Sequence, residues 1–483
     1  MPVVSEDSFF FITVDTICHR PAITCSPDTG LVEMTRILKK FDISGIVAVE
    51  DQKPVGIVSL RDLRNLIADA ADTIATLTVR DVMKTELITI RSSDYLFKAI
   101  FLMAKNNIHR LVVIDESGLL SGVMTDTDLL RIQTRSPLYL VQEIESATTL
   151  EKLRLVGKKM IGMLEYAVKT NAETQSLIQL IANFNDTFTQ RLICILDSQY
   201  DVRLPEGAAF LLLGSEGREE QTLRTDQDNA IVYPDDFTPE NVAKVQHFAE
   251  RIVSALESVG VPLCPGNKMA SNPDWCHSLS EWKELTARWI NSPGPDETVH
   301  FGVFQDLRVL HGDKSFENKL RDHIKEYTRN NSIFFPHMAR NIVTFKPPMG
   351  MFGRLLVEKK GEQRGKLDLK KGGLFALTRG ISLLALEAGI IGGTTWSKMS
   401  RLNHLHILSD TDLDTIGEAF SFLVLMRLKK QLHAVSSNRE PSNYIDPLAI
   451  TDKERDQLRS AFKGVNTLIS FLRSRYHLDM IAR

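Results

Sequence analysis

The sequence contains no apolar run long enough to cross a membrane. Its longest apolar stretches, at residues 208–214 and 381–393, are shorter than the roughly 18–20 residues that a transmembrane helix needs. The amino-terminal sequence MPVVSEDSFF lacks the basic region followed by an apolar segment that marks a signal peptide. We therefore expect neither membrane insertion nor export, and we expect the protein in the cytoplasm.

Cysteine pairs and an excess of one charge are also lacking. The five cysteines are scattered, and none belongs to a C-x-x-C pair, so free thiols are expected. The net charge is −3 without any block of like charges, which argues against a generic nucleic-acid or membrane-surface binder. What remains is an ordinary globular composition over 483 residues, which is more than one hydrophobic core normally serves.

An internal repeat occupies the first quarter of the chain. Residues 20–62 and 85–128 share a short β-like segment, an amphipathic helical pattern and a pair of apolar strands. The copies end alike, in GIVSLRD (residues 56–62) and GVMTDTD (residues 122–128). The repeat predicts two copies of one small α/β unit.

Residues 14–135 resemble a tandem pair of CBS domains, most specifically at the two repeat ends. In that family a Ser or Thr hydroxyl meets a nucleotide phosphate, and the Asp that follows holds the ribose hydroxyls. The resemblance implies an adenine-nucleotide sensor and a homodimer formed through this module. The candidate nucleotide ligands are Ser59 with Asp62 and Thr125 with Asp128. Alternatively, Ser59 and Thr125 are helix N-caps, and both interpretations can hold together.

Helical periodicity follows the repeat. Residues 136–200 carry two apolar stripes typical of amphipathic helices, and no turn-rich linker separates them from the repeat. These helices pack on the next domain's sheet, or they transmit a signal from the CBS pair. The sequence leaves both alternatives open.

The stretch GSEGREEQTLRTDQDNA (residues 214–230) contains the residues best suited to phosphate chemistry. A buried-strand pattern ends at Gly214 and Ser215, whose backbone N–H groups and hydroxyl suit phosphate oxygens. Arg218 and Arg224 follow and could neutralise the same phosphates. We therefore expect this turn to hold the phosphates of a nucleotide.

Two aspartates one residue apart complete the pattern. A strand is expected at residues 224–233, and its alternation puts Asp226 and Asp228 on the same side. Two carboxylates on one strand face repel each other unless a cation such as Mg²⁺ lies between them. The alternative, a surface turn with unrelated charges, accounts poorly for this pairing.

The Gly-Ser and Asp-x-Asp spacing resembles the nucleotidyltransferase superfamily. The fuller string resembles a nucleotidyltransferase-like family of unknown function that occurs beside CBS pairs and is related to the uridylyltransferases of the PII protein. The resemblance implies catalysis by Asp226 and Asp228 with Mg²⁺ or Mn²⁺ and a nucleoside triphosphate. Superfamily members generally carry a third carboxylate on a later strand. The strand expected at residues 260–266 holds no acid, and Asp274 is the nearest carboxylate.

The remaining sequence is mainly helical in pattern and resembles the helical domain that follows the transferase in the same family. The polar residues that could face the nucleotide cleft are Lys370, Lys371, Arg427, Lys429, Lys430 and Gln431, although a solvated basic helix face is the simpler interpretation for most of them. The fold class expected is multidomain α+β: a tandem CBS α/β module, a mixed nucleotidyltransferase-like sheet with helices, and a C-terminal helical bundle. The expected domains are residues 14–135, 136–200 (a helical connector), 201–330 (the transferase) and 345–483 (the helical domain).

Together these patterns predict a nucleotide-sensing regulatory nucleotidyltransferase that moves a nucleotidyl group from a Mg²⁺-bound nucleoside triphosphate to a hydroxyl acceptor, with a protein as the expected acceptor. The alternative is a non-catalytic adenine-nucleotide-binding signalling protein that acts through a partner, which the missing strand acid supports. Transfer to RNA is a third possibility, and the acidic balance argues against it. Neither a membrane nor a nucleic acid is expected as a partner.

Overall fold

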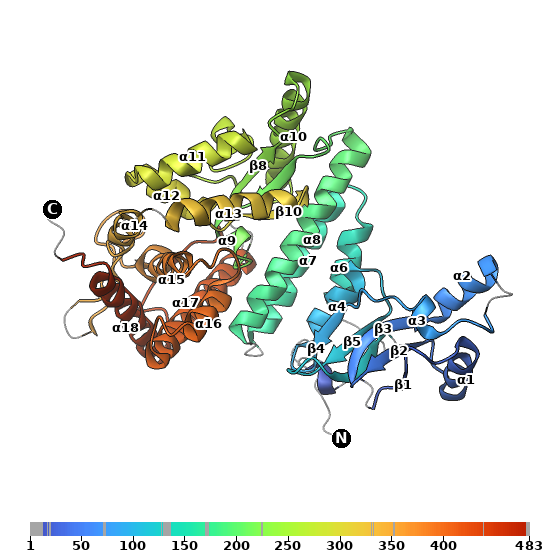
Figure 1. The fold of residues 1–483 in the computed structure, drawn as a ribbon. Helices are drawn as coiled ribbons and strands as arrows, with labels where there is room; N and C mark the ends of the chain where they lie inside the picture. Colours follow the sequence, from blue (N-terminus) through green and yellow to red (C-terminus); the bar gives the residue numbers. More distant parts are fainter. Residues whose placement is uncertain are drawn as a thin grey trace. The chain divides into compact units, whose positions relative to one another are not determined.

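The computed structural model describes most of the chain, in twelve stretches or single positions: residues 13–16, 18, 21–70, 74–126, 128, 137–169, 173–223, 226–329, 331, 333–350, 353–437 and 439–479. The candidate phosphate ligand Arg224 lies outside these described residues. The chain divides into two compact units, residues 1–143 and 144–483 (Figure 1).

In the first unit, both repeat copies fold into the same three-stranded sheet. The first copy consists of β1 (Thr24–Cys25), α1 (Leu31–Phe41), β2 (Gly45–Glu50), β3 (Lys53–Ser59) and α2 (Leu60–Ala70); the second of β4 (Thr89–Arg91), α4 (Leu96–Lys105), β5 (Arg110–Ile114) and β6 (Leu120–Thr125). Two short helices, η2 (Val14–Thr16) and α3 (Val79–Val82), precede the copies. In each sheet the first strand runs parallel and the last antiparallel to the central strand, which confirms the predicted repeat.

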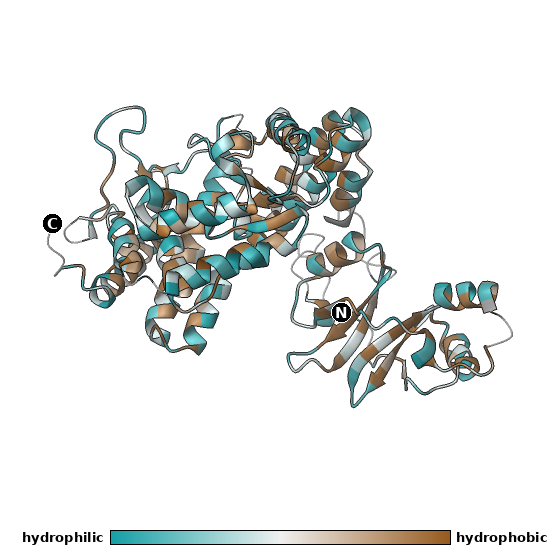
Figure 2. Ribbon diagram, turned by 45° about the horizontal axis from the view of Figure 1, so that its top comes forward, coloured by the Kyte–Doolittle hydropathy of each residue, from teal (hydrophilic) through white to brown (hydrophobic). Residues whose placement is uncertain are grey.

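Each copy is held together by the apolar face of its first helix. In α1, Leu31, Met34 and Leu38 are buried and recur at helical spacing, so they form one stripe against the sheet. Figure 2 shows the complementary pattern in the strands, which are largely brown or white, while the helices carry teal residues on their outer sides. The α/β character of this module agrees with the expectation from sequence.

The second unit is built on a four-stranded mixed sheet of order β10-β7-β8-β9. Its strands are β7 (Ala209–Leu212), β8 (Asn229–Tyr233), β9 (Cys276–Ser278) and β10 (Arg308–Gly312). Around them lie α7 (Leu150–Lys169), α8 (Thr174–Tyr200), α9 (Gly214–Gly217), α10 (Pro239–Ser258), η4 (Pro273–Trp275), α11 (Leu279–Asn291), α12 (Pro295–Phe304) and α13 (Ser315–Arg329), and α6 (Pro137–Ser146) precedes them in the chain. Helix α6 contains the division between the two units.

Helices anchor this sheet at specific contacts. The Thr238 side chain caps α10 by accepting from the Asn241 N–H, and the buried rings of Phe248 and Phe210 join α10 to β7. On α11, the Trp282 indole donates to the Ile231 carbonyl oxygen of β8 at 2.9 Å. These contacts fix the strand ends from which the candidate site is built.

The C-terminal part of the second unit is helical, shown in orange and red in Figure 1. Its elements are α14 (Phe334–Ile342), β11 (Leu367–Asp368), the π-helical turn η6 (Lys370–Leu374), α15 (Phe375–Glu387), α16 (Thr395–His404), α17 (Asp410–Ser436), β12 (Tyr444–Ile445) and α18 (Asp452–Arg475). Helices α17 and α18 pack closely at Gly464, where a Cβ would lie 2.7 Å from the Thr415 carbonyl oxygen. This arrangement matches the expected helical C-terminal region.

Two expected strands differ from the structure. Strand β8 begins at Asn229, so Asp226 and Asp228 lie in the irregular segment before it, whose backbone bonds to the 260–268 loop. Residues 260–266 form no strand, because Pro262 and Pro265 cannot donate ladder hydrogen bonds. The strand that pairs with β8 on that side is β9.

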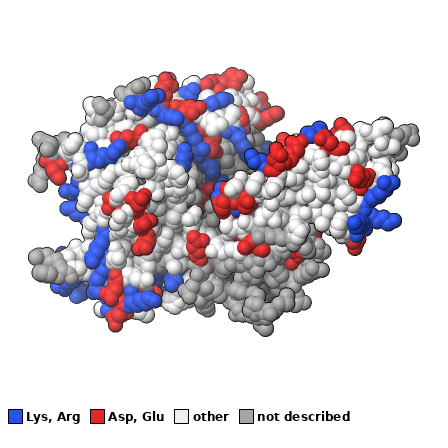
Figure 3. Space-filling model, turned by 60° about the horizontal axis from the view of Figure 1, so that its bottom comes forward, with Lys and Arg blue, Asp and Glu red and all other residues white. Residues whose placement is uncertain are grey.

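Among the described residues, every helix is too short or too polar to span a lipid bilayer. No disulfide joins cysteines within the described stretches. On the face drawn in Figure 3, basic and acidic side chains are interspersed.

Candidate functional site

A cavity of about 300 Å³ in the second unit brings the Gly-Ser turn and both aspartates together. One wall comes from the strand ends and the 264–268 loop, and the other from α12, α14, η6, α15 and α17. This volume lies at the lower end of the range of ligand pockets, roughly 300–1,000 Å³. Its polar lining residues are Gly214, Ser215, Arg218, Glu220, Thr222, Asp226, Asp228, Cys264, Lys268, Thr298, Asn341, Lys370, Thr378, Arg379 and Arg427.

The absence of a side chain at Gly214 leaves space for the Asp228 carboxylate. The chain leaves β7 and enters Gly214 with φ +53°, a left-handed conformation that favours glycine. A Cβ at Gly214 would lie 2.8 Å from Oδ2 of Asp228. Ser215, the next residue, is half-buried and lines the same cavity. The glycine in the motif is therefore explained by a close approach to the carboxylate as well as by the turn.

The buried side chain of Gln227 orients the two aspartates on either side of it. Its amide Nε2 donates to the carbonyl oxygens of Val253 and Val261, at 3.2 and 3.1 Å. Its neighbours Asp226 and Asp228 both line the cavity. Burial, and then the charge of Asp226, raises the pKa of Asp228. The two carboxylates therefore share a cavity in which their charges are poorly compensated.

Cys264 occupies the place beside the aspartates where a third carboxylate was sought. Its Sγ donates a hydrogen bond to Oδ1 of Asp228 at 3.2 Å. One ligand atom each from Asp226, Asp228 and Cys264 lie within 4.8 Å of one another, and no other such group occurs among the described residues. Burial, and then the charge of Asp228, raises the pKa of the Cys264 thiol to about 11. Asp274 is exposed and lies outside the cavity lining.

Four basic side chains line the cavity besides Arg218: Lys268, Lys370, Arg379 and Arg427. Lys370 begins the π-helical turn η6, a feature often found at functional sites, and is exposed. Burial lowers the pKa of Arg427 to about 10, and its Nε donates to Oδ1 of Asn443 at 2.7 Å. The C-terminal helices thus bring positive charge to a cavity that contains two carboxylates.

The sequence pointed to some of these cations and missed others. Lys370 and Arg427 belong to the basic residues noted in the C-terminal third, whereas Lys371 does not line the cavity. Lys268 and Arg379 were not singled out by any motif. Lys268 follows Cys264 in the CPGNK segment, which is the one sequence signal that could have indicated it.

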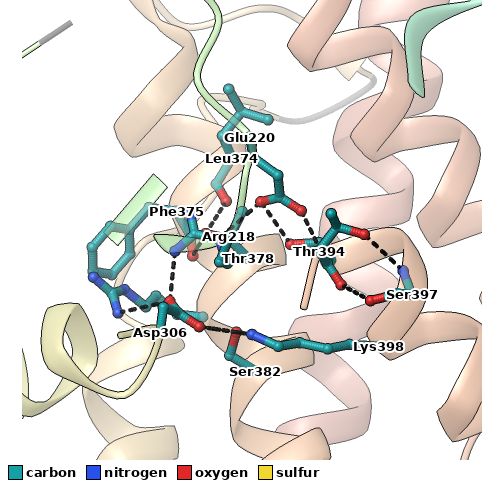
Figure 4. Close-up of polar contacts among 12 residues, drawn as sticks. Arg218, Glu220, Asp306, Leu374, Phe375, Thr378, Ser382, Thr394, Ser397 and Lys398 are labelled. Atoms are coloured by element: carbon teal, nitrogen blue, oxygen red, sulfur yellow. Dashed lines mark hydrogen bonds and ion pairs between the residues drawn. The ribbon is translucent and has the colours of Figure 1, made fainter. Parts of the chain in front are cut away.

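Arg218, a candidate phosphate ligand, is already paired inside the protein. Its Nε lies 2.8 Å from Glu220 and its Nη1 lies 2.6 Å from Asp306, and all three side chains are buried (Figure 4). Burial alone would lower the pKa of Arg218, but the two carboxylates outweigh it and raise the pKa. Arg218 lines the cavity, yet its contacts favour a structural role over phosphate binding.

The first unit contains a second cleft, of about 460 Å³, which draws on both repeat copies. Ser59, Asp62 and Thr125 line it together with Lys84 and Arg110. Ser59 donates to Oδ2 of Asp62 from both its backbone N–H and its hydroxyl, while Lys84 binds Oδ1 at 2.8 Å.

Thr125 and Asp128 repeat the hydrogen bonds of the first copy. The Thr125 backbone N–H and hydroxyl donate to Oδ2 of Asp128 at 2.8 and 2.6 Å. Asp128 is only 5% exposed and is not among the described residues lining the cleft. The Ser59 hydroxyl also accepts from the Asp62 N–H at 3.4 Å, so the N-cap interpretation holds in the first copy.

Comparison with protein families matches three parts of the chain in order. Residues 14–69 and 79–135 match the CBS domain, residues 158–296 match "Putative nucleotidyltransferase DUF294", and residues 332–476 match "Putative nucleotidyltransferase substrate binding domain". The chain therefore contains a CBS domain pair, a DUF294 domain and the substrate-binding domain named with it, in that order. The predicted order of CBS pair, nucleotidyltransferase-like domain and C-terminal helical domain is thereby confirmed.

Curated relatives match over about a quarter of the chain. An uncharacterized protein of Methanocaldococcus jannaschii is 36% identical over 27% of this chain and 42% of its own. An inosine-5'-monophosphate dehydrogenase of Bifidobacterium longum is 34% identical over 23% of this chain and 20% of its own. Among solved structures, a CBS domain protein of Pyrobaculum aerophilum complexed with AMP is 23% identical over 27% of this chain and 96% of its own, with a TM-score of 0.24. The chain thus spans less than half the length of the first of these relatives.

Proposed function

We propose that this protein is a nucleotide-sensing regulatory nucleotidyltransferase. It transfers a nucleotidyl group from a nucleoside triphosphate, bound with Mg²⁺ or Mn²⁺, to a hydroxyl acceptor on a protein. One observation carries the proposal: the carboxylates of Asp226 and Asp228 share a cavity with cations from the C-terminal helices. A metal-bound triphosphate has the charges that such a cavity complements.

The donor set fits a divalent cation. Asp226 and Asp228 supply carboxylate oxygens, and their mutual repulsion, which raises the pKa of Asp228, is the interaction that a divalent cation removes. Mg²⁺ is commonly held by one or two carboxylates together with water and substrate phosphates. When bound, the metal neutralises phosphate charge and stabilises the charge that develops during transfer.

The lining residues divide between the parts of a nucleotide. Lys268, Lys370 and Arg427 place positive charge where phosphates would lie beside the aspartates. The other lining residues include an apolar group suited to a nucleobase: Val299, Val303, Met338, Ile342, Leu374, Phe375, Phe420 and Val424.

The transfer forms a bond between the acceptor hydroxyl oxygen and the α-phosphorus. The bond from the α-phosphorus to the oxygen that bridges to the β-phosphate breaks, and pyrophosphate leaves with that electron pair. The acceptor proton passes to a cavity carboxylate or to water. Positioning and charge neutralisation supply most of the acceleration in such reactions, so two carboxylates are enough for the mechanism.

The cleft of the first unit would supply the regulation. An adenine nucleotide held by Ser59, Asp62, Thr125 and Asp128 would report the energy state of the cell to the transferase. We also propose that two CBS modules associate into a homodimer, as the tandem arrangement of this domain allows.

The test is transfer of label from the α-phosphate to an acceptor. The full-length protein is incubated with Mg²⁺, cell lysate and each nucleoside triphosphate labelled at the α-phosphate, and in parallel at the γ-phosphate. Label should reach a protein from the α-position only, since γ-label would indicate a kinase. Transfer should vanish in the double variant Asp226→Asn, Asp228→Asn and persist in Asp236→Asn, an exposed aspartate after β8.

A second candidate function rests on Cys264, the third member of the cluster with Asp226 and Asp228. Because a thiol and not a third carboxylate accompanies Asp226 and Asp228, the cavity could bind a metal-nucleotide without transferring it. Tight binding of a triphosphate without labelling of any acceptor would favour this regulator and would sink the transferase.

A further inference from the structure

A buried cluster of charges joins the transferase-like sheet to the C-terminal helices (Figure 4). Asp306, whose side chain is fully buried, binds Nη1 of Arg218 at 2.6 Å and Nζ of Lys398 at 2.7 Å. Glu220 binds the other side of Arg218 and also accepts from the backbone N–H and hydroxyl of Thr395. The cluster therefore has well-satisfied carboxylates at its centre.

The fifth charged member, Arg379 on α15, makes only a long ion pair within the cluster. Its Nη1 lies 3.9 Å from Oδ2 of Asp306, beyond hydrogen-bond distance, and that nitrogen is buried without a hydrogen-bond partner. The cluster thus contains three cations (Arg218, Arg379 and Lys398) and two carboxylates, so it has one more positive than negative charge. That excess charge is assigned to Arg379, because Arg218 and Lys398 are both bonded to Asp306.

The surroundings hold the Arg379 guanidinium in place at the cavity. The side chain is 12% exposed and lies over the Phe375 ring, 5.6 Å from its centroid. On the opposite element, Gly302 leaves the space: a Cβ there would lie 3.0 Å from Nη1. Arg379 lines the same cavity as Asp226 and Asp228. Burial, opposed in part by Asp306, lowers its pKa to about 10, so it remains charged at neutral pH.

We propose that Arg379 binds phosphate oxygens of the nucleoside triphosphate and that this anion completes the charge balance of the buried cluster. The inference rests on the proposed function and adds a specific ligand from the C-terminal helical region. A planar guanidinium can bind two phosphate oxygens at once, which suits it to this position. Lys370 is exposed, and the Nε of Arg427 donates to Asn443, whereas Arg379 is the cavity cation with a buried nitrogen that lacks a hydrogen-bond partner among the described residues.

The first test measures binding of inorganic tripolyphosphate to the full-length protein by calorimetry, without and with Mg²⁺. Arg379→Gln should weaken binding at least tenfold under both conditions, and Arg379→Lys should restore part of the loss. Arg401→Gln removes an exposed arginine from α16 and should change nothing. Equal affinities of Arg379→Gln and the wild type would overturn the inference.

The second test separates binding from a structural role. Because Arg379 bears the cost of burial without a hydrogen bond at Nη1, Arg379→Gln should melt no lower than the wild type without ligand, yet it should lose the stabilisation that tripolyphosphate gives. Arg218→Gln should melt lower, since Glu220 and Asp306 each lose a buried ion pair. A large drop in the melting temperature of Arg379→Gln would assign it to the core instead.

The outcomes also separate this inference from the proposed function. If tripolyphosphate binding depends on Arg379 but no acceptor is labelled, phosphate binding by Arg379 is supported and the proposed transferase activity is contradicted. If an acceptor is labelled while Arg379→Gln binds tripolyphosphate normally, the transferase stands and the anion site falls.

Discussion

The thiol of Cys264 donates a hydrogen bond to Oδ1 of Asp228 at 3.2 Å. The loop that carries Cys264 is fixed to the aspartate segment by backbone bonds from Gln227 to Pro262 and from Asn229 to Lys268. Position 264 is therefore a fixed part of the candidate metal site, although it lies in an irregular segment. A carboxylate placed at position 264 would therefore lie beside Asp228.

Replacing this thiol by a carboxylate should strengthen metal binding. In Cys264→Asp, three acids crowd the cavity, so the metal-free protein should melt lower, and Mg²⁺ should raise its melting temperature more than that of the wild type. Mg²⁺ affinity should rise roughly tenfold, because a hard cation prefers an oxygen ligand to sulfur. Cys194→Asp, at an exposed cysteine, is the control and should show neither effect. An unchanged response to Mg²⁺ in Cys264→Asp would place the metal elsewhere.

The Gly214→Ala variant should damage the site through Asp228. The added Cβ would lie 2.8 Å from the carboxylate, and the positive φ adds roughly 1–2 kcal/mol of backbone strain. Gly260 also has a positive φ but has nothing within 4 Å of its Cβ position, so Gly260→Ala reports the strain alone. We expect comparable melting temperatures for the two variants, with at least tenfold weaker Mg²⁺-dependent nucleotide binding only in Gly214→Ala, measured by equilibrium titration.

Asp306 should be among the costliest residues to neutralise. Asp306→Asn leaves Arg218 and Lys398 buried without their main counter-charge, and losing one partner of a buried ion pair typically costs about 3–5 kcal/mol. Asp322→Asn, on the exposed side of α13, should cost little. Urea unfolding of the full-length protein, followed by helix content, measures both. A similar loss in the two variants would mean that the buried cluster contributes no net stability.

The same carboxylate predicts a dependence on acid pH. Burial alone would raise the pKa of Asp306, but Lys398, Arg218 and Arg379 outweigh it and lower the pKa to about 2. A lowered folded-state pKa contributes stability that is complete above the ordinary value near 4 and is lost as pH falls toward 2. The wild type should therefore lose more stability than Asp306→Asn between about pH 4 and 2. The measurement is the free energy of unfolding of both proteins at several pH values. Equal losses in the wild type and in Asp306→Asn would contradict the lowered pKa of Asp306.

Local patterns predicted much of the fold because they report on local physics. Helix α10 begins where Thr238 caps it and Pro239 fits the first turn, and the two CBS copies follow from the repeat. The pair Thr148 and Glu151 has the spacing of a capping box, which would start α7 one residue too early, since Thr149 rather than Thr148 accepts from the Lys152 N–H. An error of this size is expected where two threonines adjoin.

The missed features are contacts between distant residues. Cys264 meets Asp228 across 36 positions, and Lys398 meets Asp306 across 92, through segments whose own patterns do not specify these pairings. Arg379 lies in an apolar helix, and nothing in its sequence indicates that its guanidinium reaches a cavity. Conversely, Arg218 belongs to the motif, yet tertiary ion pairs use its charge.

In the cleft of the CBS unit, both carboxylate oxygens of Asp62 already have partners, Ser59 on Oδ2 and Lys84 on Oδ1. A ribose that bound Asp62 would compete with Lys84, which lies 2.8 Å from Oδ1. Asp62→Asn should weaken AMP binding by roughly tenfold or more, since hydrogen bonds to a charged group contribute about 1.5–3 kcal/mol. Asp69→Asn, an exposed aspartate on the same helix α2, is the matched control.

Lys84→Met tests that competition directly. It removes the ion pair without touching the carboxylate, so uncharged adenosine should bind more tightly than to the wild type. AMP should gain less than adenosine, because its phosphate loses a nearby cation in the same cleft. Calorimetric titration of both ligands against the wild type and the variant gives the comparison. If adenosine affinity falls with Lys84→Met, Lys84 supports the ligand and does not compete with the ribose for Asp62.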